Sequence, residues 1–440
     1  MTGNNTKNRI KTIAVIGQGY VGLPLSLLFL SKGFTVYGVD KDLGKIRALL
    51  QAKSYLPDVT DEELSQSLET NRYYPTVEMS CIPLADAIII CVPTPLNAEH
   101  SPDLTILERA VADISRHLQK GQLVILESST YPGTTREIIK PALEQGSGLT
   151  AGIDFHIGYS PERIDPGNEI FRVEQITKVI SGLTPECLKL AEELYGKVFE
   201  SIVSVSSPEV AEFTKLLENA HRLVNISFIN ELATICDEMN IDIWEVIEAA
   251  KTKPFGFTPY YPGPGIGGHC IPVDPLYLQW KAQKAGLTSK FIEIADEVNR
   301  KAPHYVADRI HALLKRHNAP DQANLLIYGV AYKRDINDVR ESPALDLISL
   351  LAQSGHHVSY HDPYIDEIEA GGQTYKSVEL HEETLKNTHC VIIVTDHSVI
   401  PVDKIAAHAQ LVFDTRNVTD KLGNKENVYR FGAGRGSLIQ

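Results

Sequence analysis

A loop rich in glycine and proline, residues 260–277, carries a cysteine in the setting of a reactive thiol. It reads Tyr-Tyr-Pro-Gly-Pro-Gly-Ile-Gly-Gly-His-Cys-Ile-Pro-Val-Asp-Pro-Leu-Tyr. The glycines allow the backbone to adopt positive φ and to approach a ligand closely, while the prolines restrict its conformations. Cys270 is therefore a candidate nucleophile. A packing role is the alternative, because free cysteines are often buried.

Asp274 follows Cys270 by four residues, which is about one helical turn. If the chain becomes helical after the loop, the carboxylate turns back toward the thiol and its water. His269 is adjacent to the cysteine, but adjacent side chains diverge. We therefore expect His269 to pack or to hydrogen-bond, and not to act as the base of a Cys–His pair.

A second set of polar side chains lies on a long predicted helix. Ser207 and Pro208 are typical of a helix start, and apolar residues recur at helical spacing from there to residue 239. Lys215, Asn219 and Arg222 are four and three residues apart, so they project from one face. They are candidates for contact with a ligand, and a solvated polar stripe is the alternative.

The N-terminal region has the pattern of a dinucleotide site. Residues 11–16 read as a buried strand, the glycine triplet 17–22 (Gly-Gln-Gly-Tyr-Val-Gly) follows directly, and an apolar helix runs to Leu30. Such glycines permit a tight turn and bring a pyrophosphate to the helix N-terminus. A second strand, 34–39, ends at Asp40, which can bind the adenosine ribose and repel a 2′-phosphate. The pattern predicts NAD in preference to NADP.

Further buried strands are predicted at 87–92, 123–127 and 155–159, each followed by polar residues. The carboxyl edge of a parallel sheet is where ligands bind, so Thr94, Thr130, Glu162 and Arg163 are candidate site residues. The threonines could instead cap helices or turns, and Glu162 and Arg163 could pair with each other. Strands at 179–182 and 202–205 are expected to close this domain.

The C-terminal third repeats the α/β pattern, with strands predicted at 324–330, 357–360, 389–395 and 411–414. Lys333 and Arg340 lie between the first of these strands and a helix, which suits an anionic ligand. Their alternative is pairing with the nearby acids Asp335, Asp338 and Glu341. The tail from residue 432 is expected to be mobile.

These patterns predict an α/β protein with two Rossmann-like doubly wound parallel-sheet domains joined by a mainly helical segment. We place an NAD-binding domain at 1–205, a central helical domain with the cysteine loop at 206–316, and a second α/β domain at 317–440. Long apolar helices between two such domains often form an interface, so a homodimer or higher homo-oligomer is expected.

The formal net charge of −14 argues against a nucleic-acid or anionic-membrane surface. The six cysteines include no Cys-x-x-Cys pair, so neither a disulfide framework nor a metal site is indicated. The N-terminus lacks an apolar signal region, and no apolar run is long enough to span a membrane. We expect a cytoplasmic protein.

Seven motifs together resemble the UDP-glucose/GDP-mannose dehydrogenase family, from about Ile13 to Val418. In chain order they are Gly-Gln-Gly-Tyr-Val-Gly, Pro-Thr-Pro, Ser-Ser-Thr-Tyr-Pro-Gly-Thr-Thr, Ser-Pro-Glu-Arg, Glu-Phe-Thr-Lys through Asn219, Gly-Gly-His-Cys, and Tyr-Lys-Arg-Asp through Arg-Glu-Ser-Pro. The wording of the cysteine loop is similar to that of the UDP-N-acetylglucosamine 6-dehydrogenases of surface polysaccharide pathways, such as those for capsule or lipopolysaccharide.

The resemblance implies a four-electron oxidation of the sugar C6 alcohol to a carboxylate with NAD as the cofactor. It casts Cys270 as the nucleophile that forms a thiohemiacetal and then a thioester. Implied catalytic residues are Cys270, Lys215, Asn219, Asp274, Thr130 and Glu162. Implied cofactor contacts are Gly17, Gly19, Tyr20, Val21, Gly22, Asp40, Lys45, Pro93, Thr94, Thr130 and Arg340. Implied contacts to the UDP-sugar are Glu162, Arg163, Lys215, Asn219, Arg222, Tyr260, Tyr261, Gly265, Gly267 and Lys333.

The sugar remains open between N-acetylglucosamine, N-acetylgalactosamine, N-acetylmannosamine and glucose, which differ by one substituent or stereocentre. Two other functions compete with this one. A single-step hydroxyacid dehydrogenase would leave the cysteine loop and the third domain unexplained, and a non-catalytic NAD-sensing regulator would leave the candidate catalytic groups unexplained.

Overall fold

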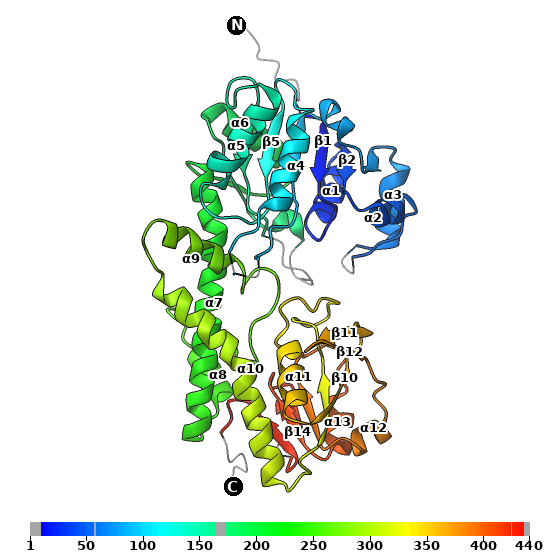
Figure 1. Ribbon diagram of the computed structural model, residues 1–440, viewed down its shortest axis with the longest axis vertical. Helices are drawn as coiled ribbons and strands as arrows, with labels where there is room; N and C mark the ends of the chain where they lie inside the picture. The colour runs from blue at the N-terminus through cyan, green and yellow to red at the C-terminus, as the bar shows by residue number, and fades with distance from the viewer. Residues whose placement is uncertain are drawn as a thin grey trace. The chain divides into compact units, whose positions relative to one another are not determined.

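The computed structural model describes residues 10–56, 59–97, 99, 101–163, 172–423 and 425–434 (Figure 1). Contacts within the described chain group into two compact units. The first comprises Met1–Glu218 together with Leu276–Leu287, and the second comprises Asn219–Pro275 together with Thr288–Gln440. The chain therefore passes between the units inside one helix and again on both sides of a short helical segment.

The first unit is built on a parallel sheet with the strand order β3-β2-β1-β4-β5-β6. Its strands are β1 (Thr12–Ile16), β2 (Thr35–Val39), β3 (Tyr73–Thr76), β4 (Ala87–Ile90), β5 (Leu123–Leu126) and β6 (His156–Tyr159). The central strands form because their apolar runs are covered on both faces, and every residue of β4, β5 and β6 is buried. The strand order reverses between β1 and β4, so ligands are expected outside the carboxyl ends of those two strands.

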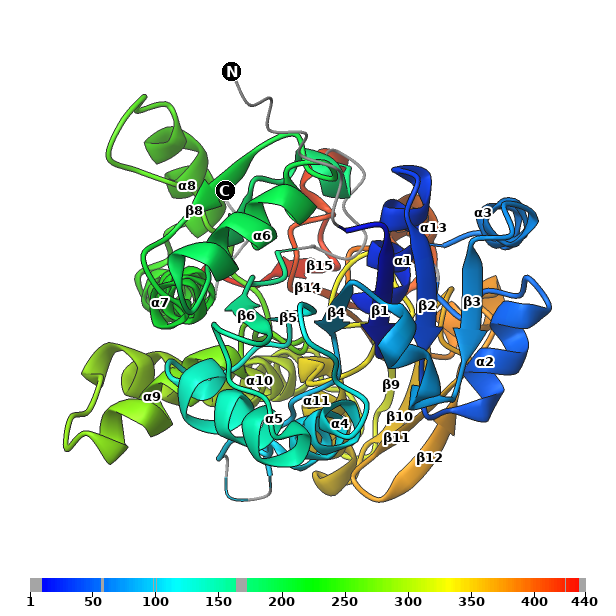
Figure 2. The same ribbon diagram turned by 90° about the horizontal axis from the view of Figure 1, so that it is seen from above.

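Helices cover both faces of this sheet (Figure 2). They are α1 (Gly22–Ser31), α2 (Leu43–Leu50), α3 (Asp61–Glu69), α4 (Thr105–Ser115), α5 (Lys140–Ser147) and α6 (Pro185–Tyr195), with short turns η1 (Met79–Leu84), η2 (Thr135–Ile139) and η3 (Val173–Gln175). Helices α1 and α6 share one apolar core with the sheet, to which Leu23, Phe29, Leu190 and Leu194 contribute. Helices α4 and α5 pack together on the opposite face.

A helical segment follows, and its bounds agree with the helical periodicity of the sequence. It contains α7 (Pro208–Met239), α8 (Ile243–Lys251), α9 (Asp274–Lys284) and α10 (Lys290–Arg316). The cysteine loop lies between α8 and α9. Because α9 begins at Asp274, four residues after Cys270, the condition stated above for Asp274 is met.

The second unit contains another parallel sheet, with the strand order β10-β9-β13-β14-β15. Its strands are β9 (Asn324–Tyr328), β10 (His357–His361), β13 (Cys390–Ile393), β14 (Val412–Asp414) and β15 (Val428–Arg430). A hairpin of β11 (Glu367–Ala370) and β12 (Gln373–Lys376), helices α11 (Pro343–Gln353), α12 (Glu382–Lys386) and α13 (Val402–His408), and the turn η4 (Asp420–Leu422) complete it. The predicted fold class, with two doubly wound sheets and a helical segment between them, is confirmed.

The strands predicted at 179–182 and 202–205 are present as β7 (Lys178–Ile180) and β8 (Ile202–Ser204), which pair with each other in a sheet of two strands. The C-terminal tail differs from the sequence prediction. The start of the C-terminal tail, expected to be mobile, is held: Ile243 N–H donates to the Gly432 carbonyl, and Gly434 N–H donates to buried Asp237. Residues 435–440 lie outside the described residues.

Within the described ranges, no helix is both long and apolar enough to cross a lipid bilayer.

Candidate functional site

The glycine turn after β1 has the geometry of a phosphate-binding turn. Gly17 has φ +95°, and a Cβ at this position would lie 2.7 Å from the carbonyl oxygen of Cys91, so only glycine fits without strain. A Cβ at Gly22 would overlap the Gly17 carbonyl oxygen. A Cβ at Gly19, in contrast, would meet nothing within 4 Å. The turn is therefore tight on its inner side and open at Gly19.

Gln18 fixes this turn from inside the protein. Its buried side chain donates to the Val15 carbonyl at 3.0 Å and accepts from the Tyr73 hydroxyl at 2.8 Å. Its backbone N–H donates to Asp40 Oδ2 at 2.9 Å, so the acidic residue at the end of β2 is joined to the turn. Lys45 Nζ lies 3.5 Å from the same carboxylate oxygen.

The geometry of the glycine turn and of Asp40 fits a bound NAD molecule. The space in front of Gly19 leaves the backbone open to a pyrophosphate, and the N-terminus of α1 begins three residues later. The carboxylate of Asp40 is placed where β2 ends, the position that recognises the adenosine ribose. Tyr20 and Val21 complete the turn before α1.

The loops that follow β4 and β5 are joined by hydrogen bonds. Thr94 Oγ1 donates to the Ser129 carbonyl at 2.6 Å, and the Tyr277 hydroxyl from α9 donates to the Thr94 carbonyl. Thr130 is fully buried, and its hydroxyl lies 2.6 Å from that of Thr134. Pro93, in contrast, is exposed. The structure thus brings Thr94 and Thr130 to the same sheet edge, as predicted.

A carboxylate from α7 holds the Thr130 loop. Both oxygens of the buried Glu212 accept backbone N–H groups, from Gly133 at 2.6 Å and from Thr135 at 2.8 Å. Burial raises the pKa of Glu212, and these hydrogen bonds act in the opposite direction. Glu212 therefore fixes the loop that carries Thr130.

The side chains of Glu162 and Arg163 have different partners and do not form the pair that the sequence allowed. Glu162 Oε2 lies 3.4 Å from the buried Lys178 Nζ. Arg163 bonds to the Thr177 carbonyl at 2.6 Å and to Glu218 at 2.8 Å. A contact between these neighbours remains through the backbone, because Arg163 N–H donates to Glu162 Oε1 at 2.6 Å.

In the second unit, the glycine loop approaches other backbone closely. The N–H of Gly268 donates to the Arg340 carbonyl at 3.0 Å, and Gly268 has φ +88°. A Cβ at Gly267 would lie 2.5 Å from the Glu341 carbonyl oxygen, and a Cβ at Gly268 would lie 2.7 Å from the Tyr332 ring. The loop therefore needs glycine at these positions because it packs against the residue 332–341 loop.

Cys270 lies directly before α9, and its carbonyl accepts the Asp274 N–H at 2.9 Å. The thiol is partly exposed and belongs to no disulfide. Asp274 is fully buried, and its Oδ2 accepts from Asn219 Nδ2 at 2.6 Å. The structure thus joins Asn219 to the acid that follows the cysteine by one turn. Lys215 is buried and lies one turn before Asn219 on α7.

The remaining predicted residues of the second unit differ in their exposure and in their hydrogen-bond partners. The Arg340 guanidinium donates two hydrogen bonds to Asp338, from Nε to Oδ1 at 3.0 Å and from Nη2 to Oδ2 at 2.6 Å. This is the alternative pairing that the sequence left open. Lys333 is partly exposed on the loop after β9. Arg222 is exposed. Tyr260 and Tyr261 contact His221 and Glu248, and Gly265 is buried beside Pro343.

Arg416 is a candidate that the sequence analysis missed. It follows the carboxyl end of β14, its Nε donates to the Val394 carbonyl at 2.8 Å, and a Cβ at Gly263 would lie 2.5 Å from its Nη1. Its guanidinium therefore lies against the glycine loop. A basic residue just after a predicted strand end was the available signal. Gln18, Glu212 and Lys178 were also missed, because nothing local in the sequence indicates their distant partners.

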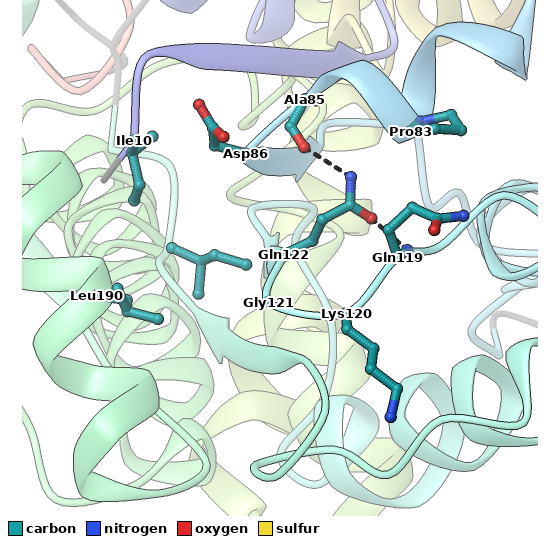
Figure 3. Close-up of a pocket in the computed structure, with 10 residues that line it drawn as sticks. Ile10, Pro83, Ala85, Asp86, Gln119, Lys120, Gly121, Gln122 and Leu190 are labelled. Atoms are coloured by element: carbon teal, nitrogen blue, oxygen red, sulfur yellow. Dashed lines mark hydrogen bonds between the residues drawn. The ribbon is translucent and has the colours of Figure 1, made fainter. Parts of the chain in front are cut away.

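A pocket of about 330 Å³ lies at the opposite, amino edge of the first sheet (Figure 3). It is lined by residues including Ile10, Asp86, Lys120, Gln122 and Leu190. Gln122 and Asp86 are occupied there with backbone groups, so the pocket offers no convergent reactive groups. Among the described residues, no cluster of His, Cys, Asp and Glu could hold a metal ion.

Three family models match the chain in order. The NAD binding domain of the UDP-glucose/GDP-mannose dehydrogenase family matches residues 11–199, its central domain matches 209–301, and its UDP binding domain matches 326–421. The chain belongs to the UDP-glucose/GDP-mannose dehydrogenase family. It is an NAD-dependent UDP-sugar dehydrogenase, and the predicted cofactor and enzyme class are confirmed.

Relatives of this dehydrogenase act on different sugars. A UDP-N-acetyl-D-glucosamine 6-dehydrogenase of Pseudomonas aeruginosa is 40% identical over 81% of this chain and 84% of its own. An NDP-N-acetyl-D-galactosaminuronic acid dehydrogenase of Ralstonia solanacearum is 33% identical over 93% and 96% of the two chains. The solved UDP-D-ManNAc dehydrogenase of Pyrococcus horikoshii is 31% identical, with a TM-score of 0.87 over 97% of this chain and 100% of that one.

Proposed function

We propose that this dehydrogenase oxidises C6 of a UDP-N-acetylhexosamine, UDP-N-acetylglucosamine foremost, to the uronic acid. The relative at 40% identity supports this choice of sugar. A covalent mechanism is supported by the position of Cys270 one turn before Asp274, whose carboxylate accepts a hydrogen bond from Asn219. UDP-N-acetylgalactosamine, UDP-N-acetylmannosamine and UDP-glucose are the alternative substrates.

NAD, when held by the glycine turn and Asp40, would supply the hydride acceptor that the two oxidation steps at C6 require. The Cys270 thiolate attacks the aldehyde carbon that the first step leaves, and the resulting thiohemiacetal becomes a thioester in the second step. Water then hydrolyses the thioester and releases the thiolate. We assign oxyanion stabilisation to Lys215 and Asn219, and proton transfer through water to Asp274.

We assign the other site residues, as proposals, the roles that the family resemblance implies. Thr130 and Glu162 assist the hydrolytic water, and Lys333 binds the nucleotide sugar, with Arg416 as an added candidate because of its position against the glycine loop. Further proposed substrate contacts are Arg163, Arg222, Tyr260, Tyr261, Gly265 and Gly267. Proposed cofactor contacts are Gly17, Gly19, Tyr20, Val21, Gly22, Asp40, Lys45, Pro93, Thr94, Thr130 and Arg340.

The covalent mechanism predicts a specific loss when the thiol is removed. Cys270→Ser should abolish uronate production, because an alkoxide leaves far less readily than a thiolate and the thioester cannot form. Cys236→Ser is the matched control, since Cys236 is another partly exposed thiol of the same unit and has no proposed role. Unimpaired uronate formation by Cys270→Ser would falsify the nucleophile assignment.

The sugar is decided by turnover of the purified protein on the four UDP-sugars with NAD. We expect the highest kcat/KM on UDP-N-acetylglucosamine, with about two NADH formed per sugar. A preference for another UDP-sugar by tenfold or more would replace the proposed substrate. A yield of about one NADH per sugar would reject the four-electron reaction.

We also propose a homodimer or higher homo-oligomer that works in the cytoplasm and supplies surface polysaccharide synthesis. The large apolar side chains Val210, Phe213, Leu217, Phe228, Ile235 and Met239 are exposed on α7 at spacings that fall on one helical face. None of the six cysteines, all of which lie in the described ranges, forms a disulfide, which fits a reducing compartment. The predicted domain boundaries, 1–205, 206–316 and 317–440, are retained as part of the proposal.

A further inference from the structure

A buried cluster of charges lies beneath the carboxyl edge of the first sheet. Lys178, at the start of β7, bonds to Glu127 Oε2 at 2.7 Å and lies 3.4 Å from Glu162 Oε2. Glu127 directly follows β5, and its other oxygen accepts the Tyr195 hydroxyl from α6. The side chains of Lys178, Glu127 and Glu162 are 3%, 0% and 10% exposed. One ammonium is thus shared by two carboxylates away from bulk water.

The environment keeps Lys178 charged. Burial lowers its pKa, but the two carboxylates outweigh burial and the net shift is upward. Its Nζ also lies 5.5 Å from the ring centre of Tyr195 and 5.4 Å from that of Phe199, where aromatic faces favour a cation. The charge on this residue is therefore constant across the neutral pH range.

Glu127 is the group whose charge varies. Burial raises its pKa to about 7, and the neighbouring Glu162 acts in the same direction, while Lys178 and Tyr195 act against it. The buried Cys91 thiol is a further ionisable neighbour, and burial keeps its pKa well above its ordinary value. The cluster can therefore bind or release one proton near neutral pH while Lys178 stays protonated.

Apolar residues of similar volume would fill this space at a lower desolvation cost than a buried lysine and two acids. Glu162 belongs to this cluster and also lies on the loop at the ligand-binding edge of the sheet. The cluster therefore connects a site residue to groups that are themselves too buried to touch a substrate. Such groups act by setting the position and charge of the residue they contact.

We propose that Lys178, balanced by Glu127 and Tyr195, is a positioning residue that orients the Glu162 carboxylate and keeps it ionised for proton abstraction from water. This inference rests on the proposed covalent mechanism, in which a thioester on Cys270 is hydrolysed. The Glu162 carboxylate takes a proton from water while the water oxygen bonds to the thioester carbon. The C–S bond then breaks, its electron pair leaves with sulfur as the Cys270 thiolate, and the carboxylic acid product and the protonated Glu162 each lose a proton to solvent.

Two substitutions in this cluster should change the pH dependence of turnover in opposite directions. Lys178→Met removes the positive charge that lies 3.4 Å from Glu162 Oε2, so a higher pH is needed to ionise that carboxylate. The acidic limb of the kcat profile should then move up by about one pH unit. Glu127→Gln removes the competing negative charge and leaves the ammonium to Glu162 alone, so the acidic limb should move down.

Covalent occupancy of the cysteine gives a second readout. Because hydride transfer precedes hydrolysis, Lys178→Met should accumulate an adduct on Cys270 at pH 7, seen by intact-protein mass spectrometry after acid quench. Lys178→Arg, which keeps the charge, should leave the acidic limb closer to its wild-type position and should accumulate less adduct than Lys178→Met does.

A merely structural role would lower the melting temperature of these variants without moving the two acidic limbs apart. The proposal is overturned if Glu127→Gln and Lys178→Met shift the limb in the same direction or leave it unmoved. Should Lys178→Met fail to fold, Lys178→Arg and Glu127→Gln carry the comparison, and an unmoved limb in Glu127→Gln then rejects it. A failure of the covalent mechanism is recognised separately, because the wild-type protein would then form no cysteine adduct.

Discussion

The buried amide of Gln18 shows how one residue shapes the cofactor turn. It joins β1, the Tyr73 hydroxyl and, through its backbone, Asp40, so the turn and the acidic residue move as one piece. Prearranged groups of this kind lose little conformational entropy when a ligand binds. We therefore expect the first unit to present the glycine turn in the same form with and without NAD.

Two glycines of this turn should respond differently to the same substitution. Gly19→Ala places its methyl group in the open space before the turn, so stability should be retained while NAD affinity falls about tenfold or more. Gly22→Ala places its methyl group onto the Gly17 carbonyl, so the fold itself should be destabilised by about 1–3 kcal/mol. Thermal unfolding and NAD titration of both variants separate the two effects. Equal losses of stability in both would contradict this description of the turn.

The shifted pKa of Glu127 predicts a pH-dependent stability. Its folded-state pKa of about 7 lies above the ordinary value of 4.5, so the folded state binds more protons between these values and stability falls as pH rises through them. The loss is at most about 3.5 kcal/mol, since one pKa unit corresponds to about 1.4 kcal/mol. Hydrogen-exchange protection in β5 and β7 should therefore decrease from pH 5 to pH 8. Glu127→Gln should remove this part of the decrease, and an identical decrease in both proteins would count against it.

At the scale of secondary structure, the loop after β9 is fixed by a buried histidine and an acid. Asp335 N–H donates to His397 Nδ1 at 2.9 Å, so the ring proton is assigned to Nε2, which donates to Asp362 at 3.1 Å. Asp362 also accepts the N–H of Val330 at 2.7 Å. Burial raises the pKa of Asp362, but these hydrogen bonds outweigh burial and the net shift is downward. Lys333 lies on the loop that this pair holds.

His397→Ala should loosen that loop and weaken binding of the UDP-sugar. The change removes the acceptor of the Asp335 N–H and one of the donors to the Asp362 carboxylate. The loss should lower the stability of the second unit by about 1–3 kcal/mol. We expect KM for the UDP-sugar to rise about tenfold, with little change in KM for NAD. His408→Ala is the matched control, because it removes a histidine of α13 that lies near the carboxylate of Glu382. An equal rise in both KM values for His397→Ala would exclude a specific effect on the loop.

Strands at the sheet edges were predicted less completely than central ones: the edge strands β6 and β10 were predicted, and two other edge strands were not. Central strands such as β4 and β13 are continuous apolar runs and were recognised from the sequence. The edge strand β3 (Tyr73–Thr76) contains Pro75 and was missed, as was β15 (Val428–Arg430) at the edge of the other sheet. Edge strands need less apolar sequence and tolerate proline, so they leave a weaker signal.

The candidate site was predictable where local sequence determines it. The turn at Gly17 and the helical turn from Cys270 to Asp274 follow from short-range spacing. The partners of the charged groups did not: Arg163 bonds to Glu218, and Glu162 lies beside Lys178. These pairs join residues far apart in the chain, and long-range pairing is set by the packing of strands and helices, not by local propensity.

At the scale of the whole molecule, the exposed apolar face of α7 predicts an assembly. Phe228 and Ile235 are 56% and 46% exposed and lie two turns apart. Phe228→Glu with Ile235→Glu should dissociate the oligomer, because charges in an apolar interface lose hydration without gaining partners. Ile153→Glu is the control, because Ile153 is an exposed apolar residue of the first unit that does not lie on α7. Light scattering measures the mass, and an oligomer that survives the double change would place the interface elsewhere.

The assignment of Leu276–Leu287 to the first unit affects how this enzyme can be recombined with its relatives. Within that unit, Tyr277 bonds to Thr94, Trp280 packs on Tyr131, and Lys281 pairs with Glu137 at 2.8 Å. A chimera that exchanges the NAD-binding residues at a single crossover would divide all three contacts between residues of two different parent chains. Gene fusions designed to change sugar specificity should therefore carry this short helical segment together with the N-terminal half.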